Sequence, residues 1–193
     1  GSDGEWSKLF DRQGITTQPF RAANCAFEVD WDKNFIMTHG GKPLKNIALN
    51  FNNNLSKGEL VISTFGIEGN TIYALSEKIQ EKLLREKIAI IQLDLKPTLT
   101  VGQLIDKQKN SKLSKTTDIL KQDINLDRSS IAILKHFTDK ETFSNHTLLA
   151  EAIKSLPVTL KSSDDMDKAI STLGGIDLNE VDENSQLKKI PNT

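Results

Sequence analysis

The hydrophobic pattern of this 193-residue chain changes its period near residue 95, and that change limits the folds open to it. Before residue 95, apolar and polar residues alternate in several short runs, which is typical of half-buried strands. From residue 99 to 155, apolar residues recur at helical spacing instead. We therefore predict an α+β fold, in which a small antiparallel β-barrel or sheet is combined with a helical cluster.

Turn-forming residues separate the predicted strands, which lie at 25–31, 46–51, 57–63, 88–95 and 158–160. One strong helix interrupts them, because Ile72, Leu75, Ile79 and Leu83 form a single apolar stripe through residue 86. The turns between strands are expected at Gly40–Pro43 and Asn52–Asn54.

Several helix ends carry recognisable signals. Ser2 and Glu5 have the spacing of a capping box, and Gly14 is placed to end the short helix that would follow. The helices of the second half are expected to begin at Thr100, Asp127 and Asn145.

Composition excludes several classes of function. The net charge is −1, from 25 basic and 26 acidic side chains, which argues against a partner such as nucleic acid or an anionic membrane. The single cysteine, Cys25, rules out an internal disulfide framework and fits a reducing compartment. The longest aliphatic run, 88–91, is far shorter than the ~20 residues of a membrane span. No secretory leader is visible, so we expect a cytoplasmic protein.

Nucleophilic and metal-dependent chemistry find little support. A cysteine hydrolase would need Cys25 beside a base such as His39, His136 or His146, but none of these lies in a recognisable motif. The histidines show no metal-binding spacing, so no metal site is predicted. The basic run of 107–121 is interrupted by Asp106, Asp118 and Asp123 and contains no Phe or Tyr, which indicates a solvated helical face.

The most informative local motif is the glycine loop from Gly66 to Asn70, which follows a strand and opens the strong helix. Free backbone amides at such a position can bind an anion or a polar ligand edge, and Gly66 and Gly69 permit close approach. Glu68 is the only ionisable group in the loop and is the one candidate catalytic residue. The alternative is a plain turn that merely starts a helix.

Seven strings, in order along the chain, resemble the bacterial BaiN-like, aminoacetone-oxidase-like group of NAD(P)/FAD-dependent flavoproteins. They are 1–6 (GSDGEW), 21–27 (RAANCAF), 43–46 (PLKN), 58–69 (GELVISTFGIEG), 94–97 (DLKP), 153–157 (IKSLP) and 169–176 (AISTLGGI). The segment from 58 to 75 is the most specific. Local pattern alone would allow a helix over 164–173, whereas the resemblance implies a strand and turn over 169–176, and we follow the resemblance.

The resemblance implies an FAD-binding domain that is split in sequence by an inserted, substrate-side domain. This chain would comprise a helical flank of the FAD domain (1–14), a β-rich part of the insert (15–98), a helical part (99–160) and a truncated return segment (161–193). The intact parent would be an FAD-dependent oxidoreductase acting on a small molecule. In that parent, the residues facing the flavin would be Ser2, Asp3, Gly4, Gly66, Gly69, Asn70, Gly174 and Gly175.

The chain departs from a complete family member at both ends. It has no strand followed by G-x-G-x-x-G, the unit that holds the pyrophosphate, and the family's last strand would stop at 191–193. We therefore predict that the chain alone binds no FAD, is inactive, and has the remainder of its own FAD domain as partner. The alternative is a non-enzymatic binding or interaction module with an unknown partner.

Overall fold

The computed structural model describes residues 4–190, and the chain divides into two compact units. The flank unit contains the residues up to Cys25 and from Asp165 onward, and the barrel unit contains Ala26–Asp164. The resemblance implied that the insert begins after residue 14 and ends after residue 160. In the structure the strand at 17–24 pairs with the return segment. The division between the units falls after Cys25 and after Asp164, so both limits lie further along the chain than expected.

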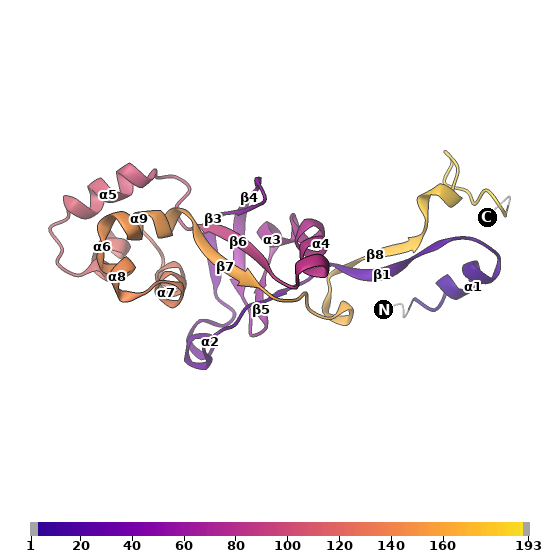
Figure 1. Ribbon diagram of the computed structural model, residues 1–193, viewed down its shortest axis with the longest axis horizontal. Helices are drawn as coiled ribbons and strands as arrows, with labels where there is room; N and C mark the ends of the chain where they lie inside the picture. The colour runs from indigo at the N-terminus through magenta and orange to yellow at the C-terminus, as the bar shows by residue number, and fades with distance from the viewer. Residues whose placement is uncertain (1–3, 191–193) are drawn as a thin grey trace. The chain divides into compact units, whose positions relative to one another are not determined.

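The barrel unit is built on one curled six-stranded sheet in which every neighbouring pair is antiparallel (Figure 1). Its strands, in spatial order, are β2 (Phe27–Glu28), β5 (Gly66–Glu68), β4 (Asn54–Ile62), β3 (Pro43–Phe51), β6 (Ala89–Asp94) and β7 (Leu156–Leu160). Asn52 and Asn53 have positive φ and form the two-residue turn between β3 and β4. The predicted α+β class and the predicted turn are thus confirmed.

Hydrogen bonds also join the two ends of this sheet. The Glu28 amide donates to the Ser162 carbonyl at 2.8 Å, and the Lys161 amide donates to the Glu28 carbonyl at 3.2 Å. Phe27 and Ser163 form an antiparallel bridge one step further along. The residues directly after β7 therefore pair with β2, and the sheet curls into a small barrel. Its interior is filled by fully buried side chains that include Phe27, Phe51, Leu60, Ile62, Ile67 and Ile91.

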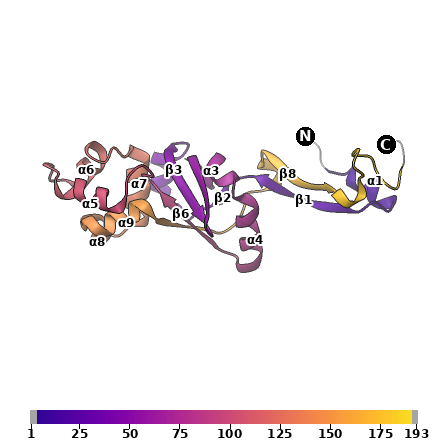
Figure 2. The same ribbon diagram turned by 90° about the horizontal axis from the view of Figure 1, so that it is seen from above.

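Helices surround the barrel. α2 (Lys33–His39), α3 (Asn70–Tyr73) and α4 (Ser76–Glu86) lie between strands in the sequence. The other five, α5 (Val101–Lys109), α6 (Thr116–Gln122), α7 (Arg128–Phe137), α8 (Lys140–Ser144) and α9 (His146–Lys154), gather at one end of the barrel unit (Figures 1 and 2). No helix in the described part of the chain is long and apolar enough to cross a membrane.

The predicted caps of the helical group are confirmed. Thr100 and Gln103 form a reciprocal capping box at the start of α5. Asp127 accepts a hydrogen bond from the Ser130 amide at 2.8 Å, and Asn145 accepts one from Thr147 at 2.9 Å. These short side chains fix where three helices begin.

Three local predictions were wrong. The single helix over 72–86 is two helices, because the chain turns at Leu75, whose φ of −116° lies outside the helical region, although all four stripe residues remain buried. The strand over 25–31 is reduced to Phe27–Glu28, since only these residues have partners in β5. The glycine loop contains a short strand, β5, which pairs with both β4 and β2.

The flank unit consists of α1 (Ser7–Arg12) and an antiparallel pair, β1 (Thr17–Asn24) and β8 (Ser171–Ile176), with two 3-10 turns, η1 (Met166–Lys168) and η2 (Leu178–Glu180). The strand that the resemblance implied over 169–176 is confirmed as β8. Gly14 ends α1 as predicted. Its amide donates a hydrogen bond to the Asp11 carbonyl, and the Ile15 amide donates one to the Phe10 carbonyl. The predicted capping box includes Ser2, which lies outside the described residues. α1 begins after Trp6, and no side chain caps its first turn.

Candidate functional site

An aromatic cluster of Trp6, Phe10 and Phe20 is the centre of the flank unit. Trp6 meets both phenylalanine rings edge to face, with centroids 5.7 Å from Phe10 and 5.5 Å from Phe20. α1 supplies Phe10, and β1 supplies Phe20. The cluster therefore holds the short helix against the two-stranded pair.

Three of the glycines predicted to face the flavin lie around this cluster. Gly4, Gly174 and Gly175 all have positive φ, and a Cβ at Gly4 would lie 2.9 Å from the Phe20 ring. A Cβ at Gly174 would lie 2.6 Å from the Pro19 carbonyl oxygen, and one at Gly175 would lie 3.3 Å from Trp6. The structure thus brings 4 and 174–175 together, while Ser2 and Asp3 lie outside the described residues.

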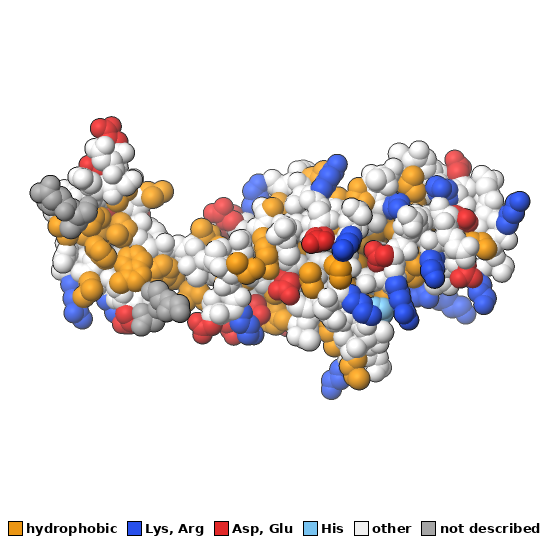
Figure 3. All heavy atoms as spheres, turned by 180° about the vertical axis from the view of Figure 1, so that it is seen from behind, with side chains coloured by type: hydrophobic (Ala, Val, Ile, Leu, Met, Phe, Trp, Pro, Cys, Tyr) orange, Lys and Arg blue, Asp and Glu red, His pale blue; other side chains and the backbone are white. Residues whose placement is uncertain are grey.

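An open hollow of about 850 Å³ lies on the same unit, between β1, β8 and the start of η2. Its apolar lining includes Pro19, Phe20, Leu173, Ile176 and Leu178, and Leu178 is 84% exposed. Hydrophobic side chains gather visibly over this unit (Figure 3). Two strands alone bury little surface, so an apolar face of this kind is typical of an interface.

Two carboxylates fix the chain after β8. Glu180 accepts hydrogen bonds from the Thr16 hydroxyl at 2.7 Å and the Thr16 amide at 3.1 Å, and it pairs with Lys189 at 3.0 Å. The Thr16 hydroxyl first, and then Lys189, lower the pKa of Glu180 to about 2. Asp177 accepts from the Asn179 amide and from Gln18, and both bonds lower its pKa. The return segment is therefore attached to β1 by ionised side chains.

The segment from Gly66 to Asn70 belongs to the barrel unit and is more constrained than the sequence indicated. The Gly66 amide donates to the Ser63 hydroxyl at 3.1 Å, and the Gly66 carbonyl accepts from the Trp31 indole at 3.1 Å. A Cβ at Gly66 would lie 2.7 Å from the Phe27 carbonyl carbon, with the carbonyl oxygen nearer still. The expectation of a free amide at Gly66 was therefore wrong, and barrel closure accounts for this glycine.

Gly69 and Glu68 follow at the end of β5. Gly69 has a φ of +115°, a Cβ there would lie 3.2 Å from the Glu59 carbonyl, and its own carbonyl accepts from the Ile72 and Tyr73 amides. Glu68 pairs with Val61 of β4 and is half-buried, and Asn70 begins α3 with an exposed side chain. The positive φ of Gly69 and the start of α3 are thus explained within the barrel unit.

The remaining candidates show no catalytic arrangement. Cys25 is buried, and residues 4–190 contain no group of three or more potential ligands that could hold a metal ion. His136 packs against Phe35, with ring centroids 4.6 Å apart, and Trp31 stacks on Phe35 at 4.9 Å. This aromatic contact between α2 and α7 was not predicted, because α2 itself was not.

Residues 21–171 match a family model described as the HI0933-like protein barrel and H2TH domain. The chain belongs to the HI0933-like family. This domain is the insert of the HI0933-like flavoproteins, so the resemblance seen in the sequence is confirmed at the level of that family. No curated protein matches the chain.

The HI0933-like fold allows a test of whether this chain fits a flavin dinucleotide by itself. The pyrophosphate of FAD is held where a parallel strand leads through a glycine-rich turn into a helix. Within residues 4–190 every strand pair is antiparallel, and Gly174 and Gly175 are already in close contact with the chain's own backbone and rings. The described residues therefore do not fit the pyrophosphate of the cofactor.

Proposed function

We propose that this chain is the inserted domain of an FAD-dependent oxidoreductase, close to the bacterial BaiN-like and aminoacetone-oxidase-like enzymes. The rest of the parent's FAD domain would hold the cofactor, with NAD(P)H as a candidate electron donor. The inserted domain would cover the substrate side of the flavin. A small molecule would be the substrate, and the chain alone would be inactive.

One observation carries this proposal: the chain leaves the flank unit and returns to it at adjacent points. In the barrel unit, the Asp164 amide donates to the Ala26 carbonyl at 2.8 Å. In the flank unit, the Ile170 amide donates to the Asn24 carbonyl at 2.8 Å, and β1 pairs with β8 from there. Domain insertion is tolerated because the two ends of a domain often lie close together, and the ends of this one do.

The flank unit supports the same proposal. Its apolar hollow, with Leu173 and Leu178 exposed, has the character of an interface, and the remainder of the FAD domain would be the partner that covers it. In the parent, Ser2, Asp3, Gly4, Gly174 and Gly175 would then lie on the flavin side of this interface. Gly66, Gly69, Asn70 and the candidate acid–base residue Glu68 would be the barrel unit's contribution.

Flavin content tests the proposal. The full-length protein encoded by the complete reading frame should purify yellow with stoichiometric FAD, whereas the 193-residue chain should remain colourless after incubation with FAD and gel filtration. Stoichiometric flavin on the 193-residue chain would show that the remainder is not needed. A full-length protein that takes up no flavin would favour the alternative, an interaction module without redox chemistry.

A further inference from the structure

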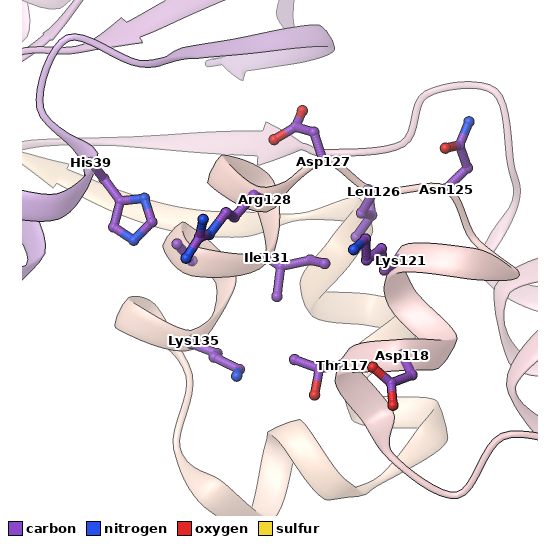
Figure 4. A pocket seen from close by; sticks show the side chains of 11 residues that line it. His39, Thr117, Asp118, Lys121, Asn125, Leu126, Asp127, Arg128, Ile131 and Lys135 are labelled. Carbon is purple, nitrogen blue, oxygen red and sulfur yellow. The ribbon is translucent and has the colours of Figure 1, made fainter.

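A second cavity, of about 670 Å³, lies within the barrel unit between the end of α2 and helices α6 and α7 (Figure 4). α7 lines it with Arg128, Ile131, Ala132 and Lys135, which follow the i, i+3, i+4, i+7 spacing of one helix face. In Figure 4 the His39 ring and the Arg128 guanidinium lie on one side of Ile131, and Lys121 lies on the other. The volume is in the usual range of small-molecule sites, ~300–1,000 Å³.

The charges around this cavity do not cancel. Three cations, Lys121, Arg128 and Lys135, line it together with two carboxylates, Asp118 and Asp127. Asp127 is already engaged, because its oxygens accept from the amide and the hydroxyl of Ser130. Among the described residues, none forms a hydrogen bond or an ion pair with the side chain of Lys121 or of Arg128. An excess of one positive charge therefore favours an anion of single charge over a polyanion.

The remaining lining is apolar or neutral. Ile131 and Leu126 are buried, and Ala132 is half-buried, so they offer a hydrocarbon surface beside the cations. Burial, followed by the charges of Lys42 and Arg128, lowers the pKa of His39 below its usual value. This lowered pKa favours the neutral form of His39, so the imidazole adds little positive charge to the cavity.

We propose that this cavity binds a small organic anion with one carboxylate and an apolar body. The carboxylate lies against Arg128, whose planar guanidinium matches it in bidentate geometry, with Lys121 and Lys135 within the same ring of side chains. The apolar body covers Ile131 and Ala132. This site is additional to the proposed flavin chemistry and does not depend on it.

Binding can be measured on the 193-residue chain by isothermal titration calorimetry, with benzoate as the probe and benzamide as its uncharged isostere. Benzoate should bind more tightly than benzamide. Arg128→Gln should weaken benzoate binding about tenfold, the effect of losing one charge-assisted contact. Lys140→Gln removes the same charge from neighbouring α8, outside the cavity lining, and should change the affinity less than about twofold.

A second variant tests the apolar part. Ala132→Leu should abolish benzoate binding by filling the cavity without any change of charge, and circular dichroism should show both variants folded. Inorganic phosphate should bind more weakly than benzoate. The proposal is overturned if benzoate does not bind, if benzamide binds equally well, if phosphate binds more tightly, or if Arg128→Gln and Ala132→Leu both bind benzoate as the unmodified chain does.

Discussion

Replacing Gly66 by alanine should open the barrel where β2 meets β5. The new Cβ would lie 2.7 Å from the Phe27 carbonyl carbon and 2.8 Å from the Val29 nitrogen. Both atoms belong to the backbone of the neighbouring chain segment, so no side chain can rotate to relieve the overlap. β2 must therefore separate from β5, which breaks the Phe27–Ile67 and Glu28–Gly66 pairs.

The magnitude follows from the side chains that this separation exposes. Phe27 and Ile67 are both fully buried, and burial of each contributes about 1.5–3 kcal/mol. Gly66→Ala should therefore lower the free energy of unfolding by roughly 3–6 kcal/mol, a large fraction of the ~5–15 kcal/mol typical of a whole domain.

Urea denaturation followed by circular dichroism measures this loss. Gly102→Ala is the matched control, because Gly102 lies in α5 with no neighbour nearer to a Cβ than 4.0 Å, and it should stabilise by about 0.5–1 kcal/mol. If the free energy of unfolding of Gly66→Ala lies within about 1 kcal/mol of that of the unmodified chain, the barrel-closure explanation of this glycine is refuted.

Three further predictions concern named hydrogen bonds. Thr100→Ala removes the capping box of α5 and should lower the free energy of unfolding, measured by urea denaturation, by about 1 kcal/mol. An unchanged denaturation midpoint would show that the cap does not stabilise the protein. Trp31→Phe removes the donor to the Gly66 carbonyl and should lower the free energy of unfolding by about 1–2 kcal/mol. A variant as stable as the unmodified chain would contradict this prediction. The pKa of Glu180 falls from its usual 4.5 to about 2, so its stabilising effect is complete above pH 4.5 and is lost as the pH falls toward 2. Hydrogen exchange in β1 should show that loss, and Glu180→Gln should remove this pH dependence; a Glu180→Gln variant with the same pH profile would contradict it.

The sequence predicted the features that depend on local chemistry. The change of hydrophobic period placed the strands and the helical group, and the oxygens of Asp127 and Asn145 fixed two helix starts because each reaches an amide only two or three residues away. Gly14 likewise ended α1, since a left-handed residue at that point satisfies the last carbonyls.

Features that depend on distant partners could not be predicted. β5 is only three residues long and is a strand because β2 and β4 pair with it. β1 contains Pro19 and shows no alternation of apolar and polar residues, and it is a strand because β8 pairs with it. The cavity beside Arg128 combines residues from 39 and from 117–135. The seven-residue spacing of Arg128 and Lys135 was visible, but α2 was not predicted, so nothing indicated which segment closes the cavity.

We propose that the flank unit is one side of an interface with the FAD-holding remainder of the parent. Hydrogen exchange of the full-length flavoprotein, compared with that of the 193-residue chain, tests it most directly. Amides of β1, β8 and η2 should exchange at least about tenfold more slowly in the full-length protein, while those of β3 and β4 in the barrel should be unchanged. Equal exchange of β1 and β8 in the two proteins would contradict the claim.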